Sequence, residues 1–111
     1  MEKLPKTFTL GNIESNIEES VNVMFNLSAI NSFEGDLVFT EDKLYFIFQA
    51  GSAGMLLGTP WCIGYDEIAE YSKTGLAGFK IILKTGEKLK FSNVFRGARE
   101  KIVSGIQAHK Q

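Results

Sequence analysis

The sequence predicts a mainly β protein, a small antiparallel barrel or pair of sheets that one C-terminal α-helix closes. Two observations predict the strands: apolar and polar residues alternate from Val21 to Ala29 and again from Phe79 to Phe91. A third predicts the helix, because Ala98, Ile102 and Ile106 recur every four residues. Nine Phe, three Tyr and one Trp in 111 residues fit such an interior, since aromatic rings pack well on a pleated, half-buried surface.

The strands and the helix can be placed in order along the chain. Most of the expected strands are bounded by short polar or glycine-containing turns, as in antiparallel hairpins. The strands are expected at Val21–Ala29, Asp36–Thr40, Leu44–Phe48, Trp61–Tyr65, Ala69–Lys73 and on either side of the turn Lys84-Thr85-Gly86-Glu87. The helix carries Phe95, Arg99 and Val103 beside its apolar stripe. Gly97 and Gly105 lower its intrinsic stability, so we expect it to depend on docking.

The N-terminal part has the weakest pattern. Pro5 and Gly11 mark an irregular segment within residues 1–19, and a short helical turn is expected around Ile13–Glu19. The length fits a single domain over residues 1–111.

The cysteine count and the apolar runs exclude several classes of protein. Cys62 is the one cysteine, so it can form neither an internal disulfide nor, by itself, a structural zinc site. The first twenty residues lack the apolar run of a secretory signal, which predicts a cytosolic location. From Leu44 to Tyr65 the chain is uncharged, but its glycines and polar residues favour strand, loop and strand over a membrane-spanning helix.

Charge is unevenly divided along the chain, although the net charge is only −1. Residues 1–72 contain eleven acidic and three basic residues, whereas residues 73–111 contain nine basic and two acidic ones. Such halves either attract each other within one fold or offer a partner one face of each sign.

Three short motifs occur in a characteristic order. Gly35–Thr40 and then Lys43–Phe46 form a glycine, strand, threonine, turn and strand pattern. The segment Ile63–Ile68 contains a hydrophobic, then an aromatic, then two acidic residues before its final isoleucine. The third motif, Ile81–Gly86 followed by Phe91, precedes the apolar stripe of the expected helix. This order resembles that of GRAM and bacterial PH-like domains, members of the pleckstrin-homology (PH) superfold, from about residue 35 to the end. The N-terminal third matches it poorly.

The resemblance implies a split barrel of about seven antiparallel strands with a helical cap, used as a binding module for lipids or proteins and not as an enzyme. Neither the motifs nor the resemblance indicates a cofactor. PH domains that hold phosphoinositides place basic residues around their first strand–turn–strand. Here the segment Asn31–Asp36 is acidic, which argues against specific inositol-phosphate recognition there.

Four lysines form the first candidate binding surface. Lys80, Lys84, Lys88 and Lys90 have the opposite parity to the apolar residues of their hairpin, so they are expected on one outer face. Each lysine close to an anionic bilayer contributes about 1 kcal/mol, enough for weak, salt-sensitive attachment. The alternative is that these lysines keep an exposed hairpin soluble and deter pairing between sheet edges.

Met55, Leu56 and Leu57, within the loop Ala50–Pro60, form the second candidate surface. If exposed, they would insert into a bilayer interface or bind an apolar partner, since contiguous exposed apolar patches rarely lack a role. If folded back, they would belong to the core or to a self-association contact. The sequence leaves both alternatives open.

Catalytic, metal and nucleic-acid functions are not indicated. Cys62 and His109 supply one thiol and one imidazole, but Cys62 lies in an apolar strand and His109 is close to the chain end. Asp66 and Glu67 are neighbours, and neighbouring side chains of a strand point to opposite faces. No strongly basic composition points to a nucleic-acid partner.

These observations predict a cytosolic GRAM/PH-like module that binds an anionic membrane surface, a lipid or an apolar ligand. The lysine hairpin and the Met55–Leu57 loop would form its binding surface, and the protein would be peripheral at the membrane. The alternative is a protein-interaction module without lipid binding, or a homo-oligomer in which acidic and basic faces of separate copies meet or strand edges join.

Overall fold

The computed structural model describes residues 1–49 and 54–110, which form one antiparallel sheet closed by a C-terminal helix. The sheet order is β1-β5-β4-β3-β2-β8-β7-β6. The strands are β1 (Glu2–Lys3), β2 (Ile17–Asn26), β3 (Ser32–Thr40), β4 (Lys43–Phe48), β5 (Trp61–Gly64), β6 (Ile68–Thr74), β7 (Gly78–Leu83) and β8 (Lys88–Ser92). The helices are α1 (Gly54–Leu57) and α2 (Arg96–His109), and single 3₁₀ turns occur at Leu10–Asn12 and Tyr65–Glu67.

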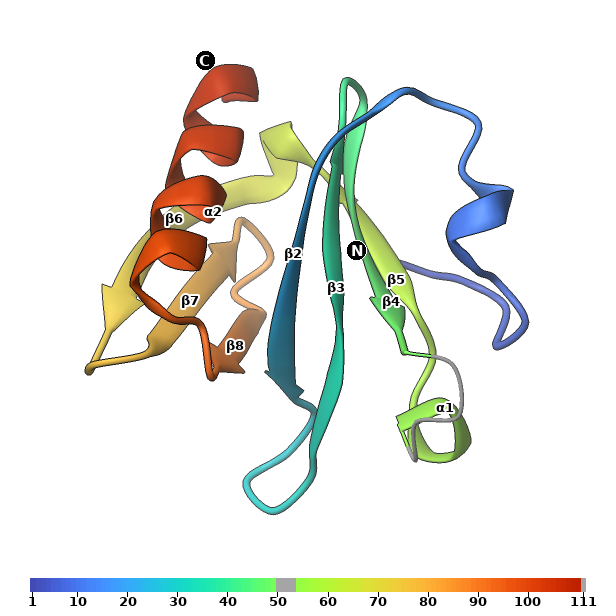
Figure 1. The fold of residues 1–111 in the computed structure, drawn as a ribbon, viewed down its shortest axis with the longest axis horizontal. Coiled ribbons are helices and arrows are strands. Elements are labelled where there is room, and N and C mark those ends of the chain that lie inside the picture. Colours follow the sequence, from blue (N-terminus) through green and yellow to red (C-terminus); the bar gives the residue numbers. More distant parts are fainter. Residues whose placement is uncertain (50–53, 111) are drawn as a thin grey trace.

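The sheet bends where β2 meets β8. Only Met24↔Ser92 and Phe25↔Phe91 pair there, so the two halves of the sheet diverge from this seam. Figure 1 shows β2 to β5 as one layer and β6 to β8 as a second that crosses it, with α2 at the corner between them. Ile102 and Ile106 of α2 are fully buried, so the helix covers the apolar interior that the divergence leaves open.

The last hairpin confirms the expected alternation. Phe79 pairs with Phe91 and Ile81 with Leu89, and these four side chains are buried. Residues of the other parity are half-buried or exposed. An aromatic cluster of Phe25, Phe46, Trp61 and Phe91 fills the space between the layers, with ring centroids 5.0 to 6.4 Å apart.

The first long strand is shifted relative to the expectation. β2 begins at Ile17 and ends at Asn26, so the expected helical turn at Ile13–Glu19 is wrong, and Leu27 and Ala29 lie outside the strand. Pairing of β2 with β3 overrides the local pattern at its start. At its end, the carbonyl of Asn31 accepts hydrogen bonds from the N–H groups of Leu27 and Ser28, at 2.8 and 3.2 Å, and closes a turn.

Two further differences concern the ends of the chain. The structure has eight strands because β1 adds to the free edge of β5, with Glu2 opposite Cys62 and Lys3 opposite Trp61. Both β1 side chains are exposed, so no apolar pattern marks the strand in the sequence. At the other end, Phe95 was expected on the helix beside the apolar stripe, but it precedes α2 and is 71% exposed.

Within its described residues, the uncharged stretch from Leu44 to Tyr65 forms β4, α1 and β5. The two flanking strands are as expected, whereas the short helix α1 lies where only a loop was expected. Residues 50–53 of the loop Ala50–Pro60 lie outside the described residues. No helix in the described part of the chain is long and apolar enough to cross a membrane.

Candidate binding surface

Two loops come together at one end of the sheet. They are the β2–β3 turn, residues 27–31, and α1 with the residues that follow it (Figure 1). Gly54 begins α1 against the sheet, where an added Cβ would lie 2.6 Å from the Phe48 ring and 2.7 Å from Phe33 Cβ. A Cβ on Gly58 would lie 3.4 Å from Leu27, so the two loops pack against each other. We call this region the open end.

The open end exposes large aliphatic side chains. Ile30 is 90% exposed, Leu56 78% and Leu57 60%, whereas Met55 is half-buried and packs against the core. Met55, Leu56 and Leu57 were predicted to act as one surface. In the structure Met55 faces the core, whereas Leu56 and Leu57 face outward. Ile30 was missed because a single aliphatic residue in a turn has no periodic pattern around it.

Lysines surround a depression at the same end. Its volume is about 380 Å³, and Lys3, Lys6 and Lys88 lie around an apolar lining that includes Leu27, Leu57 and Trp61. Lys6 Nζ also donates a hydrogen bond of 3.2 Å to the carbonyl of Leu56, which ties the N-terminal segment to α1. No sequence pattern singles out Lys3 and Lys6, because only the added strand β1 brings the N-terminal segment here.

The four hairpin lysines do not all line the same depression. Lys80 pairs with Lys90 and Ile82 with Lys88 across β7 and β8, so these lysines share the outer face. Lys88 and Lys90 line one depression together, beside the β2–β3 turn. Lys80 lies instead beside Glu70 and Ser72. Lys84 lies beside Asp66, His109 and Lys110.

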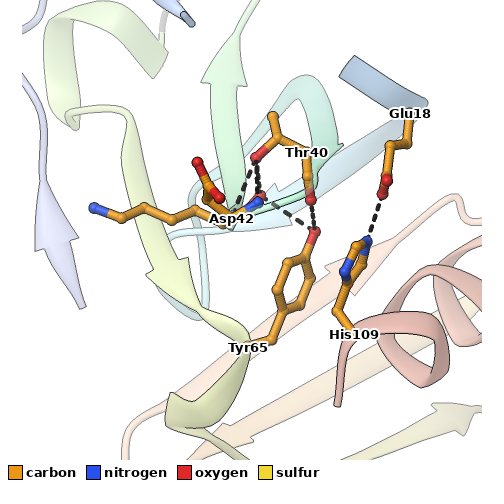
Figure 2. A network of polar contacts seen from close by, with 6 residues as sticks. Glu18, Thr40, Asp42, Tyr65 and His109 are labelled. Carbon is orange, nitrogen blue, oxygen red and sulfur yellow. Dashed lines mark hydrogen bonds and ion pairs between the residues drawn. The ribbon is translucent and has the colours of Figure 1, made fainter. Parts of the chain in front are cut away.

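A polar network fixes the end of α2 to the sheet. Figure 2 shows the Tyr65 hydroxyl directed at Thr40 and the His109 ring beside the Tyr65 ring and directed at Glu18. Tyr65 donates to the Thr40 carbonyl at 2.7 Å, and its ring stacks on His109 with centroids 4.4 Å apart. His109 Nε2 contacts the Glu18 carboxylate. Burial raises the pKa of Tyr65, so its hydroxyl stays protonated as the donor of this network.

The nucleophile and acid–base candidates are occupied by other contacts. Cys62 is buried, and burial raises the pKa of its thiol, which makes it a poor nucleophile. Its Sγ lies 3.7 Å from Glu2 Oε1, whereas His109 contacts Glu18 and Tyr65.

Asp66 and Glu67 have different surroundings. Asp66 is exposed, while the Met1 amino group and the Gly64 N–H donate to Glu67 at 2.7 and 2.6 Å. These two donors hold the pKa of Glu67 below its usual range. In the part of the chain that the structure describes, no group of three or more His, Cys, Asp or Glu residues is placed to hold a metal ion.

Comparisons with known proteins identify the fold. No family model and no curated protein matches the chain. Among solved structures, the C-terminal domain of an unknown protein from Leishmania infantum aligns with a TM-score of 0.68 and 17% identity, over 84% of this chain and 85% of that one. The linker-DH/PH structure of p115-RhoGEF aligns at 0.68 with 6% identity, and a DH/PH fragment of PDZRHOGEF in complex with human RhoA at 0.67 with 11%.

The chain has a PH-like fold. Each of the two DH/PH alignments covers 86% of this chain, and this chain spans 29% and 28% of the respective DH/PH chains. The PH-like part of the expectation is therefore confirmed, with eight strands in place of about seven. The narrower resemblance to GRAM domains stays a prediction.

Proposed function

We propose that this protein is a non-catalytic binding module of the GRAM/PH-like type that attaches weakly to an anionic membrane surface through the open end. The observation that carries the proposal is the exposure of Ile30, Leu56 and Leu57 on adjoining loops whose surroundings are rich in lysine. The module would act in the cytosol, peripheral at the membrane.

Electrostatic attraction supports this orientation. Lys3, Lys6 and Lys88 line the depression at the open end, and Glu87 is the one acidic residue among the described residues that line it. Each lysine near an anionic surface contributes about 1 kcal/mol, and the contribution weakens as salt screens it. The attraction holds this end of the domain toward the bilayer.

Insertion of aliphatic side chains supplies the second contribution. Full burial of a Leu or Ile side chain contributes about 1.5 to 3 kcal/mol, and three such side chains are available. Immobilising the protein on the surface costs at least about 4 kcal/mol, which offsets much of this gain. The sum is a weak, salt-sensitive association, which suits a module that leaves the membrane readily.

Vesicle co-sedimentation tests the proposal with matched variants. Leu56→Ala combined with Leu57→Ala is expected to lower binding to vesicles containing phosphatidylserine by at least tenfold, and high salt is expected to weaken wild-type binding. Leu76→Ala is the control, because Leu76 is 96% exposed in the β6–β7 turn, across the molecule from α1 (Figure 1). Equal losses in both variants, or equal recovery with neutral vesicles at low salt, would contradict the proposal.

Exposed apolar side chains at the β6–β7 turn, which contains Leu76, favour a second candidate function, protein interaction or self-association. Phe95 is also exposed there, and the β6–β7 turn is held beside the start of α2. The Val94 N–H donates to the Ala77 carbonyl at 2.7 Å, and Arg99 donates to the Gly75 carbonyl at 3.0 Å.

A protein-bound state is known for one fold neighbour, since the PDZRHOGEF fragment was solved with RhoA. Light scattering of wild type and Leu76→Ala tests the self-association form of this candidate. A wild-type monomer at all salt concentrations would remove it.

A further inference from the structure

The chain between β1 and β2 covers part of the outer face of the first layer. Figure 1 shows this segment, in blue, on the side of β2 to β5 that faces away from β6 to β8. The Phe8 ring stacks on the Tyr45 ring of β4, with centroids 5.9 Å apart. Val38 lies opposite Tyr45 across β3 and β4. It has the parity opposite to the core residues Leu37 and Phe39, yet it is 0% exposed, so apolar packing continues on this outer face.

An apolar groove remains between this segment and the strands. Its volume is about 240 Å³, below the lower limit of about 300 Å³ for pockets that hold drug-sized ligands. Its apolar side chains are Phe8, Leu10, Ile47, Phe48, Met55 and Pro60. Ile47 and Phe48 are buried in the sheet, which fixes the strand side of the groove, whereas Leu10 is 50% exposed. The groove therefore suits a small apolar or aromatic group.

Asp36 adds a carboxylate to the lining of this apolar groove. It is half-buried, and the Asn22 amide donates to its Oδ1 at 3.3 Å. In the described part of the chain, no Lys, Arg or His forms an ion pair with it. A carboxylate has about four acceptor sites, so most of them stay open to a ligand. A half-buried charge without a countercharge favours a cation that can reach it.

The other charges around the groove also favour a cation over an anion. Glu34 is exposed two residues before Asp36 on β3, so both carboxylates lie on the same face of the sheet. Lys6 is the one basic residue among the described residues that line the groove, and its Nζ donates to the Leu56 carbonyl at 3.2 Å. All the lining residues lie within the acidic part of the chain, residues 1–72. A cationic ligand therefore meets net attraction here.

We propose that this groove binds a small amphipathic amine, with one ammonium group on an aromatic or branched aliphatic body. The ammonium donates to the open acceptor sites of Asp36, and the apolar body lies against Ile47 and Phe48. A neutral analogue keeps the apolar contact but loses the charge on the donor, and charge-assisted hydrogen bonds are about twice as strong as neutral ones. This site is separate from the proposed membrane contact, because none of the exposed aliphatic side chains of the open end lines it.

NMR titration of the wild-type protein with three probes tests the inference. 2-Phenylethylamine, 2-phenylethanol and phenylacetate share a phenyl ring and differ in the charge of the attached group. The amine is expected to bind more tightly than the alcohol by about fivefold or more, because only the amine brings a charge to the carboxylate. Phenylacetate is expected to bind more weakly than the alcohol. The amide signals of Thr9, Asp36 and Ile47, which line the groove, are expected to shift most.

Two matched variants locate the charge that the amine recognises. Asp36→Asn keeps an acceptor for Asn22 and is expected to reduce the ratio of amine to alcohol affinity to near one. Glu34→Gln removes the same charge from an exposed position on the same face, where solvent screens it, and is expected to retain most of that ratio.

Three outcomes would each overturn the groove as an amine site. They are equal affinity of the wild type for amine and alcohol, equal loss of the ratio in both variants, and shifts confined to the open end. The comparison of probes uses the wild-type protein alone, so it decides the inference even where a variant fails to fold.

Discussion

Gly97 and Gly105 are expected to respond in opposite directions to the same substitution. Both lie in α2, where Ala is favoured over Gly by about 0.5 to 1 kcal/mol. A Cβ on Gly97 would meet no atom within 4 Å, so Gly97→Ala is expected to stabilise the protein by up to that amount. A Cβ on Gly105 would lie 2.6 Å from two ring carbons of Phe39, whose side chain is 1% exposed.

The clash at Gly105 outweighs the gain in helix propensity. Overpacking a well-packed core costs about 1 to 3 kcal/mol, so Gly105→Ala is expected to destabilise the protein by about 1 kcal/mol net. The two variants should therefore differ by about 2 kcal/mol in the free energy of unfolding, measured by urea denaturation with an unchanged m-value. Stabilisation of equal size in both variants would show that α2 does not rest on Phe39 as the structure has it.

Two further variants test the contacts that position the helix and the N-terminal segment. Tyr65→Phe removes the buried donor to the Thr40 carbonyl and is expected to lower stability by about 1 kcal/mol in thermal unfolding, whereas an unchanged melting temperature would argue against that bond. The Met1 amino group and then the Gly64 N–H lower the pKa of Glu67, because both interact favourably with its ionised carboxylate. These interactions stabilise the fold at neutral pH, and their contribution is lost as the pH falls through the pKa of Glu67. Glu67→Gln should therefore cost up to about 1 kcal/mol at pH 7 and progressively less below about pH 4 in urea unfolding, and a cost that does not change with pH would contradict this assignment.

Sequence periodicity predicted the parts of the fold where one face is buried. Phe79, Ile81, Leu89 and Phe91 alternate with lysines because the hairpin has a core side and a solvent side. In α2 the same reasoning placed the buried Ile102 correctly. Periodicity works in both places because burial acts directly on every second or every fourth residue.

Features without a buried face could not be predicted in this way. β1 is held by backbone pairing with β5, and its side chains, Glu2 and Lys3, are exposed. The apolar and polar alternation of β2 continues past the end of the strand to Leu27. There the Asn31 carbonyl closes the β2–β3 turn.

The candidate site was predicted only in part, because its residues come from separate segments. Parity placed Lys88 and Lys90 on an outer face but gave no sign that they meet Asn26 across the β2–β8 seam. It also grouped Lys84 with them, although Lys84 lies beside His109. Such groupings depend on tertiary pairing, which local patterns do not encode.

Site-directed spin labelling tests the membrane orientation most directly. A nitroxide placed through Leu56→Cys is compared with one placed through Leu76→Cys on vesicles containing phosphatidylserine, and buried Cys62 is expected to remain unlabelled in the folded protein. Power saturation is expected to place the label at position 56 in the oxygen-rich acyl region and the label at position 76 in water. Both labels in water, or only the label at position 76 in the bilayer, would contradict attachment through the open end.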